Sequence, residues 1–185
     1  MMQKLIDETK SRMDKVIEMT KRELGTLRTG RANPSLLDRV EVEAYGSRMP
    51  LNQVAMVSVP EPRMIVVQPY DKSTISAIDK AIRIADLGLN PSSDGSILRI
   101  SIPALTEERR KELVKLGKKI SEDMKIAVRN VRRDSNDELK KLEKDNQITE
   151  DDQKKGQNDV QKLTDDYITK IDSLLAEKEK EIMEV

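Results

Sequence analysis

Residues 106–145 read TEERRKELVKLGKKISEDMKIAVRNVRRDSNDELKKLEKD, and this stretch decides the fold. It contains no proline and a single glycine, Gly117, so it can form one unbroken helix of roughly 60 Å at ~1.5 Å per residue. Its apolar side chains recur at three- and four-residue steps, which is typical of one buried stripe along a helix. The members of that stripe are Leu113, Leu116, Ile120, Met124, Ala127, Val131 and Leu142.

The basic side chains of this helix fall on the side opposite the stripe when residues are placed at steps of about 100° around the axis. They are Lys111, Lys115, Lys118, Lys125, Arg129, Arg132, Arg133 and Lys140. Between Asp123 and Glu143, no carboxylate falls inside this basic arc. We therefore expect a helix that packs inward along its length and presents a ridge of cations outward.

Composition excludes several classes of chemistry. The chain has neither cysteine nor histidine, which rules out disulfides, Cys/His zinc sites and imidazole acid–base catalysis. It also lacks Phe and Trp, so its core must be aliphatic. No apolar run reaches the ~20 residues of a membrane helix, and the N-terminus lacks the apolar region of a signal peptide. We expect a soluble, cytoplasmic monomer that uses no cofactor or metal and contacts no membrane.

Charge is balanced in total but not along the chain. The 34 basic and 34 acidic residues cancel. However, residues 106–146 carry thirteen basic against ten acidic side chains, whereas residues 147–185 carry six against eleven. This asymmetry favours a polyanionic partner on one side of the molecule.

Two further helices flank the opening stretch. Residues 2–27 have roughly heptad apolar spacing and predict a first helix, which Gly30 and Pro34 end. Thr149 with Asp152 three residues later predicts a capping box that opens a last helix, ending near Glu184. Three amphipathic helices with a tight final connection predict an antiparallel three-helix bundle of residues 1–30 and 105–185.

The segment between the first and second helices differs in kind. All seven prolines lie within residues 31–104. Short β-branched runs there predict strands near 40–45, 54–59, 64–68 and 97–102, around one helix that begins after Asp71 or Ser73 and ends by Gly88. The expected fold is therefore α+β with two domains, in which a small β/α/β domain of residues 31–104 is inserted into the bundle.

The inserted domain joins the bundle through two short strands only, which predicts a hinge. The hinge residues are Thr29, Gly30, Arg31, Pro103, Ala104 and Leu105. Two adjacent connections permit rotation about one axis and restrain separation. Replacing Gly30 with proline is expected to stiffen this joint.

The cluster Lys125, Arg129, Arg132 and Arg133 is the strongest candidate binding site. Four cations within nine residues can reach the phosphates of a nucleic acid, and the planar arginine fork suits bidentate contacts. Arg28 and Arg31 extend this patch if the end of the first helix lies near the middle of the long helix. No aromatic platform accompanies the cluster, so structured RNA contacted through its backbone fits better than stacked single strands.

Catalytic motifs are missing from the sequence. It holds no GxxxxGK or GxGxxG pattern, and the acidic pairs Asp151–Asp152 and Asp165–Asp166 point about 100° apart on a helix. We therefore expect no enzyme. Two alternatives stay open: a helical adaptor whose ridge meets an acidic protein groove, and a metal-assisted hydrolase built on the acidic last helix.

Five motifs in order resemble the ribosome recycling factor family across essentially the whole chain. They are RTGRANPSLLD at 28–38, DLGLNP at 86–91, PALTEERR at 103–110, VRNVRRD at 128–134 and DVQKLTD at 159–165. The resemblance implies a non-enzymatic factor that binds ribosomal RNA of the large subunit, in the intersubunit space of a ribosome that has finished termination. It also implies that elongation factor G, hydrolysing GTP, pushes on the smaller domain until the subunits separate. The family's RNA contacts carry over to Arg129, Arg132 and Arg133, and more weakly to Arg28 and Arg31.

Overall fold

The structure, a computed structural model, describes residues 1–184 and divides the chain into two compact units. The first unit combines residues 1–29 with the chain from Glu107 onward, and the second comprises Gly30–Thr106. Each unit has its own hydrophobic core. Within the described part of the chain, the search for a helix long and apolar enough to span a membrane found none.

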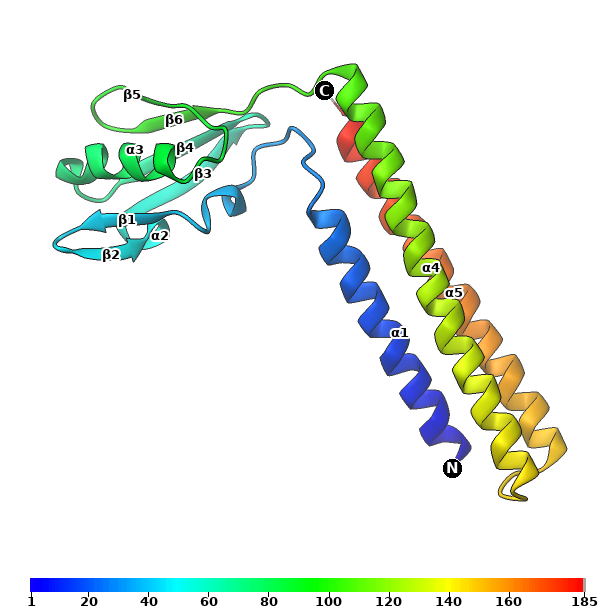
Figure 1. Cartoon of the computed structure of the whole chain (residues 1–185). Coiled ribbons are helices and arrows are strands. Elements are labelled where there is room, and N and C mark those ends of the chain that lie inside the picture. The colour runs from blue at the N-terminus through cyan, green and yellow to red at the C-terminus, as the bar shows by residue number, and fades with distance from the viewer. Residues whose placement is uncertain (185) are drawn as a thin grey trace. The chain divides into compact units, whose positions relative to one another are not determined.

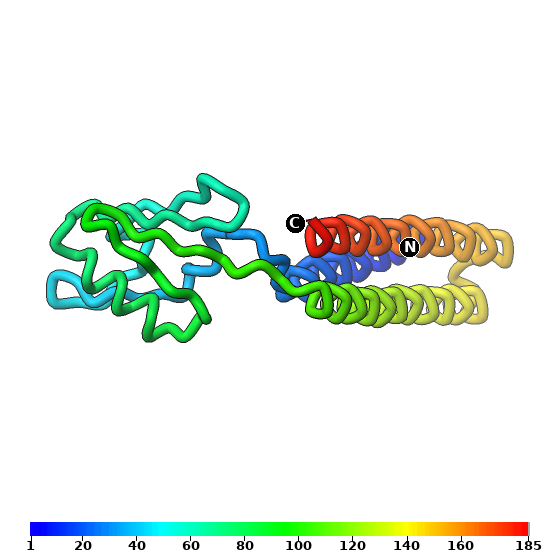
Figure 2. The backbone as a smooth tube through the Cα atoms, turned by 90° about the horizontal axis from the view of Figure 1, so that it is seen from above, coloured from blue at the N-terminus to red at the C-terminus, as the bar shows by residue number. Residues whose placement is uncertain are grey.

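The first unit is a three-helix bundle. It consists of α1 (Met2–Gly25), α4 (Glu107–Lys144) and α5 (Glu150–Met183). α4 runs antiparallel to the other two helices (Figure 1), and α1 packs against both α4 and α5, as the view from above also shows (Figure 2). The antiparallel bundle predicted from the amphipathic spacing is confirmed.

A short turn between α4 and α5 reverses the chain. Asn146 adopts the left-handed conformation at φ 56°, and the Gln147 N–H donates to the Leu142 carbonyl at 2.9 Å. Asn tolerates this conformation better than most residues, which suits it to the end of a helix. The predicted capping box then opens α5: Thr149 Oγ1 accepts from the Asp152 N–H at 3.1 Å, and the Asp152 carboxylate accepts from the Thr149 N–H at 3.2 Å.

The core of the bundle is aliphatic with one aromatic ring. Its central cluster comprises Met13, Val16, Ile17, Val128, Val131, Tyr167 and Ile171. The hydroxyl of Tyr167 donates to the Asp14 carboxylate at the edge of the bundle. Burial, reinforced by this bond to Asp14, raises the pKa of Tyr167 to about 12, so the phenol stays neutral across the physiological range.

The buried side of α4 differs in part from the predicted stripe. Leu116 is 45% exposed, whereas Gly117, Ser121, Ser135 and Leu139 are buried. Two helices cover α4, so the buried arc extends to small residues that a hydropathy pattern passes over. Their size lets the neighbouring helices approach closely, and the Ser135 hydroxyl is satisfied by a 2.7 Å hydrogen bond to Thr9 Oγ1 on α1.

The second unit packs an antiparallel sheet and a hairpin around one helix. The sheet has the strand order β3-β4-β6-β5, and β1 pairs with β2 in a separate hairpin. Alternate residues point into the core, among them Ile65 and Val67 of β4 and Leu98 and Ile100 of β6. The bounds are η1 Pro34–Leu37, β1 Glu41–Ala44, β2 Ser47–Pro50, α2 Leu51–Val54, β3 Ala55–Glu61, β4 Met64–Pro69, η2 Lys72–Thr74, α3 Ile75–Ile84, β5 Pro91–Ser93 and β6 Leu98–Ser101.

Three short elements of this unit escape prediction. β2, β5 and α2 span only three or four residues each, and the two strands carry mostly exposed side chains. β1 and β6 are as short as β2 but alternate buried and exposed residues, whereas β2 and β5 carry no period-two signal because pairing with a neighbour rather than burial of a face holds them. The four predicted strands and the helix after Asp71, whose carboxylate accepts from the Ser73 N–H at 2.9 Å, are all present.

Close helix packing generates a stability prediction at Gly156 in α5. A Cβ at this position would lie 2.8 and 3.0 Å from the two methyl carbons of Leu139, which is fully buried. We expect Gly156→Ala to lower the free energy of unfolding by about 1–2 kcal/mol, because overpacking outweighs the gain in helix propensity. Gly25→Ala, in α1 with nothing within 4 Å of its Cβ, is the matched control and should raise stability by up to about 1 kcal/mol. Urea denaturation measures both, and equal stability of the two variants would contradict this account of the packing.

Candidate nucleic-acid interface

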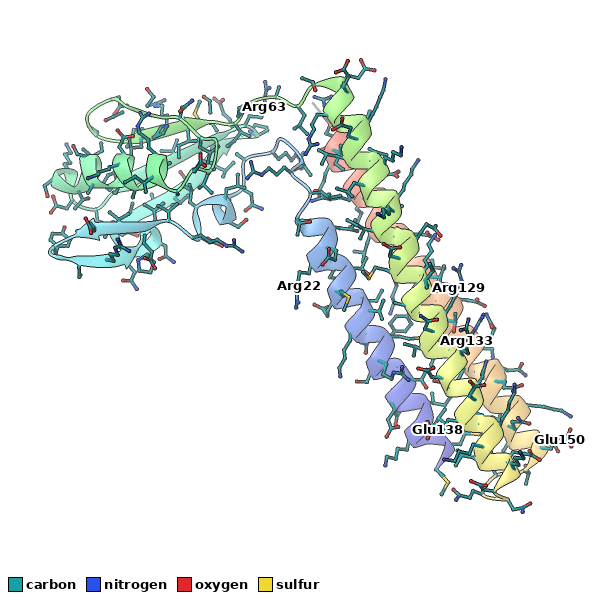
Figure 3. The ribbon with its side chains drawn as sticks, viewed as in Figure 1. Arg22, Arg63, Arg129, Arg133, Glu138 and Glu150 are labelled. Atoms are coloured by element: carbon teal, nitrogen blue, oxygen red, sulfur yellow. The ribbon has the colours of Figure 1, made fainter. Side chains whose placement is uncertain are left out.

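Arg129 and Arg133 form an exposed pair on the outward side of α4. They lie four residues apart, so their side chains leave the helix about one turn apart along the same face. Both are exposed, and among residues 1–184 no ion pair is found for either (Figure 3). This arginine pair therefore presents two permanent charges with their hydrogen-bond donors directed to solvent.

Ion pairs on either flank show which side of α4 faces outward. On one flank, Lys125 Nζ lies 2.5 Å from Asp172 of α5. On the other flank, Arg12 of α1 donates to Asp134 at 2.6 Å. Because the arginine pair lies between these flanks on the helical wheel, no other helix of the bundle covers it.

Lys125 corrects the prediction that the whole cluster faces solvent. Its side chain is only 15% exposed, and its ammonium also lies 3.3 Å from Glu122. The bond to Asp172 raises the pKa of Lys125 above its ordinary value against the opposing effect of desolvation. The physical reason is angular: Lys125 sits at the edge of the basic arc, next to α5. Its charge stabilises the bundle instead of projecting outward.

Arg132 also differs from its predicted setting. It is partly buried at the seam between α4 and α5, and its Nη1 donates to Gln161 Oε1 at 3.3 Å. Gln161 in turn donates to Asp165 at 2.9 Å. Arg132 is thus held along the side of α5 by a polar chain, while Arg129 and Arg133 project freely.

The remaining lysines of the ridge are mixed with acids. Lys111 pairs with Glu107 at 2.8 Å, and Glu122 lies within the basic arc itself, one turn before Ile126. Ile126 is 52% exposed on the same outward side, a residue that the predicted apolar stripe omitted. Placing Ile126 on the wheel at about 100° per residue would have found it among the cations.

Arg28 does not extend the patch around Arg129. The end of α1 packs beside Gly117 of α4, whose Cβ position lies 3.4 Å from Leu27. Twelve residues separate Gly117 from Arg129, or about 18 Å along the helix at ~1.5 Å per residue. The condition under which Arg28 would extend the patch is therefore not met, and Arg28 would need a separate contact. Arg31 belongs to the second unit.

The two linking segments lie outside any helix or strand. Residues 28–33 and 102–106 have no regular hydrogen-bonded structure. Gly30 has φ 73°, and a Cβ there would lie 3.2 Å from Leu105 Cγ, so the two segments are adjacent at this point. Proline requires φ near −65°. Gly30→Pro would therefore distort the backbone locally, so this variant does not isolate the stiffness of the joint.

Several acidic residues of α5 have structural partners. Asp152 belongs to the capping box, and Asp165 accepts from Gln161. Over the described residues, the search for groups of three or more His, Cys, Asp or Glu side chains that could hold a metal ion found none. The site is accordingly a cationic helix face, which can attract polyanions electrostatically.

Comparison with known sequences points to one family. Residues 20–183 match the profile described as ribosome recycling factor. The chain is 62% identical to the ribosome-recycling factor of Geobacillus sp. (strain WCH70) and 61% identical to that of Bacillus subtilis (strain 168), each over 185 residues and 100% of both chains. The corresponding protein of Bacillus licheniformis is 62% identical over 181 residues, 98% of each chain.

Solved structures give the same result. A solution structure of a ribosome recycling factor aligns with a TM-score of 0.75 and 44% identity, covering 100% of this chain and 98% of the other. A second match has a TM-score of 0.63 and 48% identity over 100% of both chains. It is the Thermus thermophilus ribosome recycling factor, which is described together with Escherichia coli elongation factor G bound to the E. coli post-termination complex.

The Lys125–Asp172 pair generates a pH-dependent stability prediction. We expect Asp172→Asn to lower the free energy of unfolding by about 0.5–1 kcal/mol at neutral pH, because half of Asp172 is exposed and water screens the pair. The raised pKa of Lys125 means that this contribution is complete below the unfolded lysine pKa of ~10.4 and is lost as pH rises through the folded value. Urea denaturation from pH 7 to 11 should show the two proteins converging at high pH. A difference in the free energy of unfolding that stays constant from pH 7 to 11 would show that the charge on Lys125 does not stabilise the bundle through Asp172.

Proposed function

Because the chain belongs to the ribosome recycling factor family, we propose that it binds ribosomes that have finished termination and separates their subunits together with elongation factor G. GTP is hydrolysed on that partner, and messenger and transfer RNA leave as the subunits part. The chain itself binds and transmits force and performs no covalent chemistry. The observation that carries this proposal is the 62% identity to a ribosome-recycling factor over the full length of both chains.

The RNA contact in this proposal lies on α4. Arg129 and Arg133 supply exposed guanidinium groups, and Arg132 contributes from the seam with α5. Two of the three tyrosines, Tyr45 and Tyr70, are exposed but belong to the second unit, and Tyr167 is buried. The bundle therefore offers cations without a ring on which bases could stack, a combination that suits folded large-subunit RNA contacted through its backbone.

Movement in this proposal occurs at the six linking residues, Thr29, Gly30, Arg31, Pro103, Ala104 and Leu105. Their lack of regular structure and the adjacency of Gly30 and Leu105 support a hinge at this place. Two short chains that lie together allow rotation and limit separation. The bundle would hold RNA while the second unit receives the push of the GTPase and passes it to the contacts between subunits.

A splitting assay tests the function and its RNA contact together. Light scattering should report subunit separation only when the chain, elongation factor G and GTP are all present. We expect Arg129→Ala and Arg133→Ala each to weaken ribosome binding by about 1–3 kcal/mol and to lower the slope of log affinity against log salt by about 1. Lys15→Ala, which removes one exposed charge from α1, is the control and should leave the slope unchanged. Splitting without elongation factor G, or equal slopes for all variants, would refute the corresponding part of the proposal.

The hinge is tested by alanine at two left-handed glycines. Gly30 and Gly88 have φ 73° and 68°, so an alanine should strain both by about 1–2 kcal/mol. Only Gly30 lies beside the opposite linking segment; nothing lies within 4 Å of the Cβ position at Gly88. We expect Gly30→Ala to slow splitting at saturating factor while ribosome affinity stays within twofold, and Gly88→Ala to split normally. Equal rates for both variants would argue against bending at Gly30.

A further inference from the structure

Ile126 lies in the middle of the outward side of α4, opposite the buried residues of that helix. It is 52% exposed, while the next two residues, Ala127 and Val128, turn toward the core. At about 100° per residue, Arg133 lies about 20° from Ile126 around the helix, and Arg129 and Asn130 flank it within about 60°. The flanking ion pairs of Lys125 and Arg12 show that neither α5 nor α1 reaches this side.

The bundle gains little from isoleucine at this position. A β-branched residue is a weaker helix former than alanine or lysine, and a half-exposed side chain keeps much of its apolar surface in water. Glu122 and Asp123 precede Ile126 by four and three residues, and Lys125 lies 3.3 Å from the Glu122 carboxylate. Ile126 thus lies between two acidic residues on its N-terminal side and the arginine pair on its C-terminal side.

This arrangement matches the shallow groove of an RNA duplex. A-form RNA displays riboses and base edges in a wide, shallow minor groove, bordered by phosphates. Arginines one turn apart can reach the phosphates, while an apolar side chain about one turn before the first of them meets the sugar surface. A protein partner fits less well, because the centre of a protein interface buries several apolar side chains together, whereas Ile126 is a single apolar side chain among polar ones.

We propose that Ile126 is a specificity-determining contact, which seats against ribose and base edges in the minor groove of an RNA duplex held by Arg129 and Arg133. This rests on the proposed function and adds to it a contact that is independent of charge. An electrostatic ridge alone would bind any polyanion, whereas an apolar side chain next to its two arginines requires the shape of the groove.

Substitution of Ile126 by lysine distinguishes binding by charge alone from seating of Ile126 in the groove. If charge alone governs binding, Ile126→Lys should tighten ribosome binding, since it adds a cation to the patch. If Ile126 seats in the groove, Ile126→Lys should weaken binding at high salt, and Ile126→Ala should weaken it about three- to tenfold with the salt slope unchanged. Leu116→Ala and Leu116→Lys are the matched controls, since Leu116 is a 45% exposed apolar residue of the same helix at a different angle. Circular dichroism confirms that each variant is folded.

The results of these binding measurements distinguish a failure of the Ile126 contact from a failure of the proposed function. If Ile126→Ala loses no ribosome affinity and Ile126→Lys binds more tightly, the role of Ile126 is overturned. A lower slope of log affinity against log salt for Arg129→Ala would still support the RNA contact. No effect at Ile126 or Arg129 overturns both. A benzophenone amino acid at position 126 of the full chain identifies the partner: we expect a photo-adduct with large-subunit RNA on ribosomes. An adduct with a ribosomal protein only would overturn the proposal.

Discussion

The structure depends on the covering of one long aliphatic face. α4 has 38 residues and one apolar side, whose exposure to water would be unfavourable. α1 and α5 together bury this side from Leu113 to Leu139. Burial of a helix face is strongest where side chains interlock, and here small residues let the three backbones approach. Once two neighbours are seated, the rotation of α4 about its axis is determined. The outward direction of every other side chain on that helix follows.

This rotation sorts the cations of α4 into two groups. Lys125 and Arg132 lie at the border with α5 and are engaged by Asp172 and Gln161. Arg129 and Arg133 lie farther around and remain exposed. The bundle thus uses some of its basic side chains to hold its own helices together and leaves others for a partner. A count of charges along the sequence treats both groups alike, although only Arg129 and Arg133 present their charges without a side-chain partner among the described residues.

The second unit obtains its stability separately. Its core is made of alternating residues from the sheet and of Ile78 and Ile82 from α3, with no contribution from the long helices. A unit that buries its own apolar surface can turn as a body when its connections bend. The proposed action relies on this independence, because a force applied to one unit must move it without melting the other.

Periodicity and turn chemistry in the sequence by themselves determined the four long helices, four of the six strands, the capping box at Thr149 and the insertion of an α+β segment into a bundle. These features depend on neighbours within a few residues, where spacing and capping act directly. Only the tertiary structure decided that Leu116 faces solvent, that Lys125 pairs with Asp172, and that Arg28 lies far along α4 from Arg129. The reason is that a helical wheel gives angles within one helix, whereas exposure and pairing depend on where the second and third helices lie against it.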